Sequence, residues 1–262
     1  MLATGSNSLT GFRLSIRSGA DGFSFSVEST PGGSVVQTER FPVSDTALAA
    51  DVLRQALQKP YLMDYRFQSV ELLADTPATI VPLEHFNKSD MLAFYRLCFP
   101  AKSEESRARS NSQLSTLNSQ PSSADMQYQI LSSVEAAMIF RLDQDVLRIV
   151  QECYPDVKVC CADARHLEHF AAQQEKRPAP DAEPQNDVYL HVEPQYIFLA
   201  AFCRNRLLYA ASQPAANDAD RTFLLLGIWK ALDLNAQRDV LHLEGASKDL
   251  QKTVAEYILN IE

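Results

Sequence analysis

The chain has 262 residues, 46% of them hydrophobic, which suffices for one large globular domain or two modest ones and excludes a disordered chain. Its formal net charge is −9, and the sequence contains no lysine- or arginine-rich run that would form a basic patch. We therefore expect no binding to nucleic acid. The five cysteines show no CxxC spacing, and the start of the sequence does not resemble a leader, so we expect a cytoplasmic protein. No apolar segment is long enough to cross a membrane, so we expect no direct membrane insertion.

The first 100 residues predict strands, a helix and more strands. In LSIRSGADGFSFSVES, residues 14–29, apolar residues alternate on both sides of a Gly-rich turn, which is typical of a hairpin. Helical spacing of leucines behind a Ser-Asp pair then predicts a capped helix. In chain order we expect a third strand at 34–43, a helix at 44–58, strands at 68–77 and 78–86, and a short helix at 87–100.

The middle of the chain contains two polar segments. Residues 101–125 are rich in serine, asparagine and glutamine and predict a mobile loop, because they offer little apolar surface to bury. A strand, a helix, a strand and a helix follow between residues 135 and 174. The charged, proline-rich residues 176–186 predict a connector between domains.

The last part of the chain repeats the opening order of elements. Three strands, a helix, a strand and a helix are expected between residues 187 and 260. The order and the segment lengths match those of the first part, which indicates an internal duplication. We therefore expect an N-terminal half at 9–175, which carries the loop 101–125 and an inserted strand–helix–strand–helix segment, and a C-terminal half at 187–262.

This duplicated order resembles the actin-like ATPase superfamily, an α/β fold whose two RNase H-like halves each carry a mixed sheet around a cleft. The segment MIFRLDQDVLRIVQECYPDVKVCCADARHLEHF is distantly similar to actin-like proteins of pilus assembly and cell division. The whole chain looks more like a bacterial family of this fold known as a domain of unknown function. The matching stretches are LSIRSGADGFSFSV, LLADTPATIVPLEHF, DVYLHVEPQYIFLAAF and LLLGIWKALDLNAQRDVLHLEG.

The resemblance points to three turns as candidate ligand contacts. In ATPases of this fold, a strand ending in Asp precedes a Gly-containing turn that wraps the phosphates with N–H groups, and the Asp helps to hold the cation. Here Arg17 or Ser18 stands at the strand end, and Gly19, Asp21 and Gly22 form the turn. An Asp-Gly tip is also usual in ordinary hairpins, so we expect a hairpin that holds no phosphate.

The second and third turns also depart from the ATPase pattern. Glu193-Pro194-Gln195-Tyr196 stands at the second phosphate turn without a glycine, and Pro194 has no N–H to offer. Gly245 follows the last long strand, where the ATPases hold adenosine, but backbone geometry explains a glycine there equally well. Candidate cleft residues are therefore Ser18, Gly19, Asp21, Gly22, Glu193 and Gly245; we predict no catalytic residue, bound metal or cofactor.

Two other groups of residues suit metal chemistry less well than a structural role. Asp75 ends a strand but belongs to an Asp-Thr-Pro sequence typical of an ordinary turn. His166 and His169 lie three apart on a helix, near Asp163, Glu168 and the Cys160–Cys161 pair; we interpret them as an exposed polar helix face. Trp229 lies among apolar residues and is expected in the core.

These observations favour a non-catalytic scaffold of actin-like fold that binds other proteins, with a homodimer as one possible assembly. Two alternatives stay open. One is a nucleotide-binding protein with diverged loops that uses Gly19, Gly22 and Gly245. The other is a small-molecule or metal-dependent enzyme with Asp75 and Glu193 as its acids.

Overall fold

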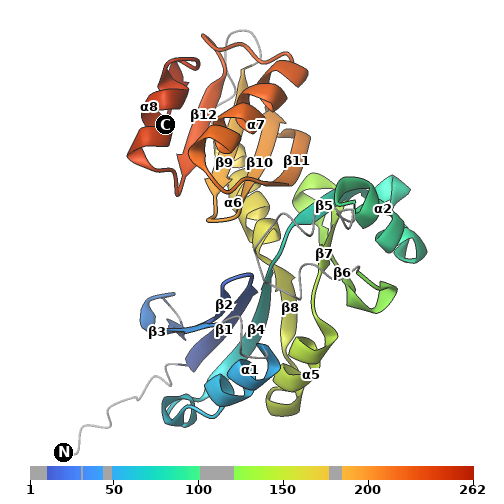
Figure 1. Ribbon diagram of the computed structural model, residues 1–262, viewed down its shortest axis with the longest axis vertical. Helices are drawn as coiled ribbons and strands as arrows, with labels where there is room; N and C mark the ends of the chain where they lie inside the picture. The colour runs from blue at the N-terminus through green and yellow to red at the C-terminus, as the bar shows by residue number, and fades with distance from the viewer. Residues whose placement is uncertain (1–10, 31, 44–48, 101–120, 177–184) are drawn as a thin grey trace, which may run out of the picture. The chain divides into compact units, whose positions relative to one another are not determined.

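The computed structural model describes residues 11–30, 32–43, 49–100, 121–176 and 185–262 (Figure 1). Most of the expected loop at 101–125 and of the connector at 176–186 lies outside these ranges. The chain divides into two compact units, each of which is described by itself. Unit 1 consists of Met1–Thr76, Ala101–Asp125 and Leu142–Cys160, and unit 2 of Pro77–Pro100, Met126–Arg141 and Cys161–Glu262.

Unit 1 is built on a sheet of β1 (Gly11–Gly19), β2 (Gly22–Thr30), β3 (Val35–Pro42), β4 (Phe67–Asp75) and β8 (Lys158–Cys161). Its strand order is β3-β2-β1-β4-β8, with β1 antiparallel to β2 and parallel to β4. The alternation seen in the sequence is confirmed, because Leu14 and Ile16 of β1 and Phe25 and Val27 of β2 are buried.

Two helices of unit 1, α1 (Ala49–Leu57) and α5 (Gln144–Cys153), pack against each other. Each buries one stripe, with Leu53 of α1 and Ile149 of α5 almost inaccessible to solvent. α5 begins at Asp143 because the carboxylate of that residue accepts a hydrogen bond of 2.8 Å from the Asp145 N–H.

Unit 2 contains a sheet of β9 (Asn186–Val192), β10 (Tyr196–Cys203), β11 (Arg206–Pro214), β12 (Val240–Glu244) and β13 (Asn260–Ile261). Its order is β11-β10-β9-β12-β13, and β9 is antiparallel to β10 and parallel to β12. This order matches the order in unit 1 strand for strand. The internal duplication expected from the sequence is therefore confirmed as a shared sheet topology.

The two faces of this second sheet are covered by different helices. One face packs on α7 (Asp218–Ala231) and α8 (Lys248–Ala255) through a core that includes Leu190, Leu225 and Leu250. Trp229 of α7 belongs to this core, as expected. Successive side chains of a strand point to opposite faces, so Tyr189, next to Leu190, faces away from this core.

Helix α6 (Ala162–Lys176) covers the opposite face of that sheet. Its Phe170 ring stacks on Tyr189 of β9, with ring centroids 4.5 Å apart, and lies 6.5 Å from the ring of Phe198 in β10. Gln174, one turn further along α6, donates a hydrogen bond of 2.8 Å to the hydroxyl oxygen of Tyr189. These contacts hold one side of α6 firmly against the sheet.

Unit 2 also contains a smaller sheet of β5 (Ala78–Pro82), β7 (Ala136–Arg141) and β6 (Met126–Leu131), in the order β5-β7-β6. Helix α2 (Met91–Cys98) packs on it through Tyr95. Short 3-10 helices span Pro60–Met63, Leu83–His85, Lys88–Asp90, Ser123–Asp125 and Ser132–Val134.

This smaller sheet changes our interpretation of the inserted segment. We expected the insertion to be a strand, a helix, a strand and a helix between residues 135 and 174. These four elements are present as β7, α5, β8 and α6. However, α5 and β8 stand in unit 1 where α8 and β13 stand in the second sheet, so the elements without a counterpart there include β5, β6, β7 and α2. The boundaries 9–175 and 187–262 for the two halves stay a prediction. Within the described ranges, no helix combines the length and apolarity needed to span a membrane.

Candidate functional site

The first turn, between β1 and β2, is a tight hairpin. Gly19 pairs with Gly22 across it, and Ser18 pairs with Phe23 one position earlier. Gly22 has φ +117°, and a Cβ atom there would lie 2.3 Å from the carbonyl oxygen of Phe41 in β3. The close approach of β3 therefore requires a glycine here, independently of any ligand.

Arg17, near the end of β1, holds the carboxylates around this turn. Its guanidinium forms an ion pair with Asp75 at the end of β4 and lies 3.0 Å from Oδ1 of Asp21 at the turn tip. The side chain of Asp75 is only 2% exposed. A Cβ atom on Gly19 would lie 3.0 Å from Asp21 Oδ1 and 3.3 Å from Arg17 Cζ, so these two side chains cover Gly19. Asp75 is thus more than a turn residue, because its buried carboxylate is also an ion-pair partner.

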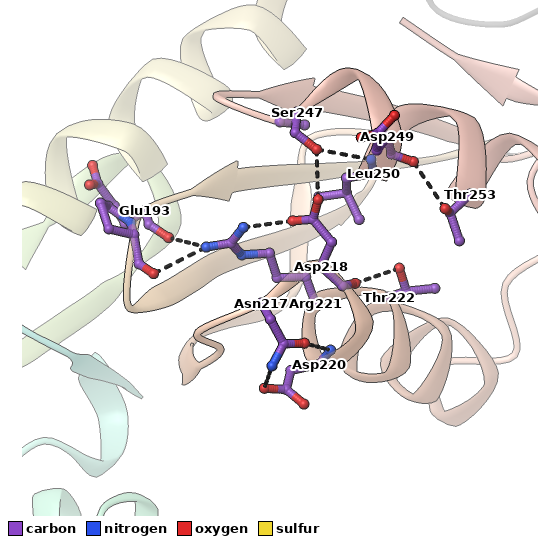
Figure 2. A network of polar contacts seen from close by, with 12 residues as sticks. Glu193, Asn217, Asp218, Asp220, Arg221, Thr222, Ser247, Asp249, Leu250 and Thr253 are labelled. Atoms are coloured by element: carbon purple, nitrogen blue, oxygen red, sulfur yellow. Dashed lines mark hydrogen bonds and ion pairs between the residues drawn. The ribbon is translucent and has the colours of Figure 1, made fainter. Parts of the chain in front are cut away.

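The second turn, between β9 and β10, is closed by its own backbone and held by Arg221 of α7 (Figure 2). The Glu193 N–H donates a hydrogen bond of 3.0 Å to the carbonyl oxygen of Tyr196. Arg221 donates from Nη2 to the carbonyl oxygens of Glu193 and Pro194, at 3.0 and 3.1 Å, and from Nη1 to Asp218 at 2.7 Å. Two carbonyl oxygens of this turn therefore point at the guanidinium of Arg221.

The third turn, after β12, is joined to the same network. Gly245 has φ +72°, and a Cβ atom there would lie 2.7 Å from the carbonyl oxygen of Val192 in β9. Ser247 donates 2.7 Å to Asp218 and accepts a hydrogen bond of 3.0 Å from the Leu250 N–H, which caps α8 (Figure 2). The hydrogen bond from Ser247, followed by that from Arg221, lowers the pKa of the Asp218 carboxyl.

A cluster of histidine and glutamate side chains lies beside these two turns in unit 2. The rings of His166 from α6 and His191 from β9 stack with centroids 3.7 Å apart and an interplanar angle of 27°. Nε2 of His191 lies 3.1 Å from Oε1 of Glu193, and its Nδ1 lies 3.4 Å from Oε2 of Glu244 in β12. One nitrogen from each histidine and one oxygen of Glu193 lie within 4.8 Å of one another.

The two imidazoles have pKa values shifted in opposite directions. Burial, followed by the charge of His191, lowers the pKa of His166 to about 4, so His166 is neutral near pH 7. Burial alone would lower the pKa of His191 as well. The hydrogen bond and charge of Glu193 and the charge of Glu244 outweigh that effect, and the pKa of His191 is raised above its ordinary value.

The surroundings of α6 correct our interpretation of its polar face. His169 and Glu168 are exposed, as expected. His166, however, is partly buried against the sheet, and Asp163 is fully buried, with its carboxylate hydrogen-bonded by the hydroxyl of Ser212. The helical spacing showed that these side chains share a helix, but it did not show that one side of this helix covers a sheet.

The structure brings some of the candidate residues together. Glu193 follows the β9 residue that Gly245 contacts, so these two belong to one local arrangement in unit 2. The other four lie on the first turn, in unit 1. All six candidates remain a prediction as ligand contacts: Ser18, Gly19, Asp21, Gly22, Glu193 and Gly245. Sequence reasoning missed Arg221, a cation inside an apolar helix, and His191, whose only signal was its place two residues before Glu193.

Comparison with families agrees with this fold. A family model described as "Protein of unknown function (DUF3822)" matches residues 6–261. A Bacteroides thetaiotaomicron protein with actin-like ATPase fold and unknown function is 24% identical, with a TM-score of 0.75 over 96% of this chain and 90% of that protein. The chain therefore has an actin-like ATPase fold with two mixed sheets. Among curated proteins, none matches the chain.

Two of the more distant similarities are to the following proteins. The PilM–PilN type IV pilus biogenesis complex matches with 12% identity and a TM-score of 0.50, over 95% of this chain and 87% of that one. The cytoplasmic domain of EpsL, an inner membrane component of the type II secretion system of Vibrio cholerae, matches with 14% identity and a TM-score of 0.40, over 95% and 97%.

Proposed function

The chain belongs to the DUF3822 family of proteins of unknown function, and we propose that it is a non-catalytic scaffold of actin-like fold that binds other proteins and does not bind nucleotide. The observation that carries this proposal is the contact of Arg17 with Asp75 and Asp21. These three side chains lie at the turn that corresponds to the one with which ATPases of this fold hold phosphate and cation.

A magnesium–triphosphate ligand needs carboxylates to hold the cation and N–H donors to meet the phosphate oxygens. At the first turn, both nearby carboxylates already face the Arg17 guanidinium. Moving that guanidinium towards a phosphate would take it from a carboxylate that is 98% buried, and a buried charge that loses its partner is costly. The first turn is therefore better suited to holding the ends of β1 and β4 together than to holding phosphate.

The second turn supports the same proposal. The Glu193 N–H is used to close the turn, and Pro194 has no N–H. Two carbonyl oxygens and the Glu193 carboxylate lie where a phosphate would need donors, and carbonyl oxygens repel an anion. Gly245, the remaining trace of a nucleotide site, is explained by its φ of +72° and its contact with Val192.

Two observations favour another protein as the partner of this chain. The net charge of −9 disfavours nucleic acid as a partner. The PilM–PilN match shows a protein of similar fold in complex with a second protein, and we take it as support for a protein partner here. Self-association to a homodimer is one form that such binding can take.

The nucleotide half of the proposal is tested by calorimetric titration with Mg-ATP and by thermal shift. We expect no heat of binding and no shift, whereas a ligand at a hundred times its dissociation constant stabilises a protein by about 2.7 kcal/mol. Binding by the wild-type chain that disappears in Gly19→Val would overturn the proposal. Gly19 is the better position for this variant, because valine at Gly245 would strain the backbone whether or not a ligand binds.

The partner half is tested by cross-linking the tagged full-length chain inside cells that produce it, followed by mass spectrometry. We expect one protein, or a second copy of this chain, to be cross-linked reproducibly and to copurify with the chain at a fixed ratio. A monomer without a reproducible partner would contradict the proposal, and it would do so independently of the Mg-ATP result.

A further inference from the structure

Three side chains from three different segments converge in unit 2 on a small volume beside the second turn. His166 comes from α6, His191 from the end of β9, and Glu193 from the turn that follows β9. One donor atom from each lies within 4.8 Å of the other two, and all three residues are partly buried. Two imidazoles and a carboxylate are the ligand set that Zn²⁺ and related divalent transition metals take in open protein sites.

The fold brings the two imidazoles together independently of any ligand. The stack of Phe170 on Tyr189 fixes α6 over β9, so that His166, one helical turn before Phe170, stacks on His191, two residues after Tyr189. The helix repeat of about 3.6 residues and the strand repeat of two bring these pairs into register. Rigid elements that hold ligand side chains in place are a requirement for a specific metal site.

A second set of contacts orients the donors. Nδ1 of His191 is buried and lies 3.4 Å from the Glu244 carboxylate. With Nε2 on a metal ion, the Nδ1–H would donate to Glu244, the usual carboxylate–histidine–metal arrangement. Arg221 holds the main chain of Glu193 by the hydrogen bonds shown in Figure 2.

We propose that His166, His191 and Glu193 form a binding site for a divalent transition metal of the Zn²⁺ type, with Glu244 orienting His191. The ion would take the place of the hydrogen between His191 Nε2 and Glu193 Oε1, now 3.1 Å apart. Ligand atoms about 2.0–2.1 Å from a tetrahedral ion lie about 3.4 Å from each other. The His191–Glu193 pair therefore has to open by about 0.3 Å, and any donors as far as 4.8 Å apart have to close by about 1.4 Å. Side-chain rotation of Glu193, and of His166 out of its stack on His191, supplies these shifts.

The site is tested on the full-length chain after removal of metal with a chelator and exchange into metal-free buffer. Calorimetric titration with Zn²⁺ alone should show a single ion per chain and a rise in melting temperature. His166→Gln and Glu193→Gln should each weaken binding by more than about 100-fold, and Glu244→Gln by about 10- to 100-fold. Addition of Co²⁺ should give visible absorption bands whose intensity reports a low coordination number.

Two histidine variants serve as controls. His85→Gln removes an exposed histidine of unit 2, 69% exposed, and should leave Zn²⁺ affinity unchanged. His169→Gln changes an exposed residue of α6 that lies 4.0 Å from the Glu244 carboxylate, and it should change affinity by less than about threefold. Far-UV circular dichroism and the fluorescence of Trp229 in α7 show whether each variant is folded.

Three results would overturn the proposal. The first is that the wild-type chain does not bind Zn²⁺. The second is binding that survives both His166→Gln and Glu193→Gln. The third is binding that depends on His169 and not on His166, which would place the ion on the exposed helix face. Should His166→Gln fail to fold, Glu193→Gln still decides, because glutamine has nearly the shape of glutamate. Zn²⁺ binding here does not depend on whether Mg-ATP binds the chain.

Discussion

The ion pair between Arg17 and Asp75 is the contact on which the proposed function depends most, and Arg17→Ala tests it directly. The substitution removes the guanidinium from the end of β1 and leaves the Asp75 carboxylate at the end of β4, where only 2% of its side chain is exposed. It also removes the weaker contact with Asp21, which lies 3.0 Å away at the exposed turn tip.

Removing one partner of a buried ion pair costs about 3–5 kcal/mol of stability. Because 27% of the Arg17 side chain is exposed, solvent screens part of this interaction, and we expect a loss of about 2–3 kcal/mol. Arg13→Ala is the matched control on the same strand. Arg13 pairs with Glu28, but its side chain is 36% exposed, and its removal should cost no more than about 1 kcal/mol.

The assay is urea unfolding followed by far-UV circular dichroism, together with hydrogen exchange of peptides from β1 and β4. Trp229 is the only tryptophan and lies in unit 2, so its fluorescence reports the other unit and serves as a second probe. Asp75→Asn completes a double-mutant cycle with Arg17→Ala, for which we expect a coupling energy of about 1–3 kcal/mol.

The reasoning is refuted if Arg17→Ala destabilises unit 1 no more than Arg13→Ala does. It is also refuted if the effects of Arg17→Ala and Asp75→Asn add to within about 0.5 kcal/mol, since residues that interact directly do not behave independently. In either case Asp75 would not hold the guanidinium strongly, and the main argument against the nucleotide-binding alternative would be lost.

Three further predictions concern unit 2. Gly245→Ala should lower stability by about 2 kcal/mol or more in urea unfolding, because φ is +72° and the new Cβ would lie 2.7 Å from a β9 carbonyl oxygen; an unchanged midpoint would contradict this. Ser247→Ala should lower stability by about 1 kcal/mol through loss of the α8 cap. It should also raise the pKa of Asp218, measured by NMR of the carboxyl carbon, and an unchanged pKa would contradict the role of the Ser247 hydrogen bond. Phe170→Ala should lower stability by about 3–5 kcal/mol, because it opens a cavity against Tyr189. It should also weaken Zn²⁺ binding, and an unchanged affinity would show that the aromatic stack does not position His166.

Local pattern was enough to predict most of the elements. Alternation in residues 14–29, helical spacing of apolar residues and glycine-containing turns act over a few residues, so they can be read directly from the chain. Repetition of their order predicted the duplication, which the identical sheet orders confirm. β13 was missed because two residues form no pattern. β6 was missed although Met126, Tyr128 and Ile130 alternate.

The contacts on which the two proposals rest were revealed only by the tertiary structure. Arg17 and Asp75 are 58 positions apart, and the parallel register of β1 and β4 brings them together. His166 meets His191 because an aromatic stack seats α6 on one face of a sheet. Each side chain taken alone is an ordinary polar residue of a helix, strand or turn. Strand register and helix packing depend on burial of the whole apolar surface, and no short stretch of sequence contains that information.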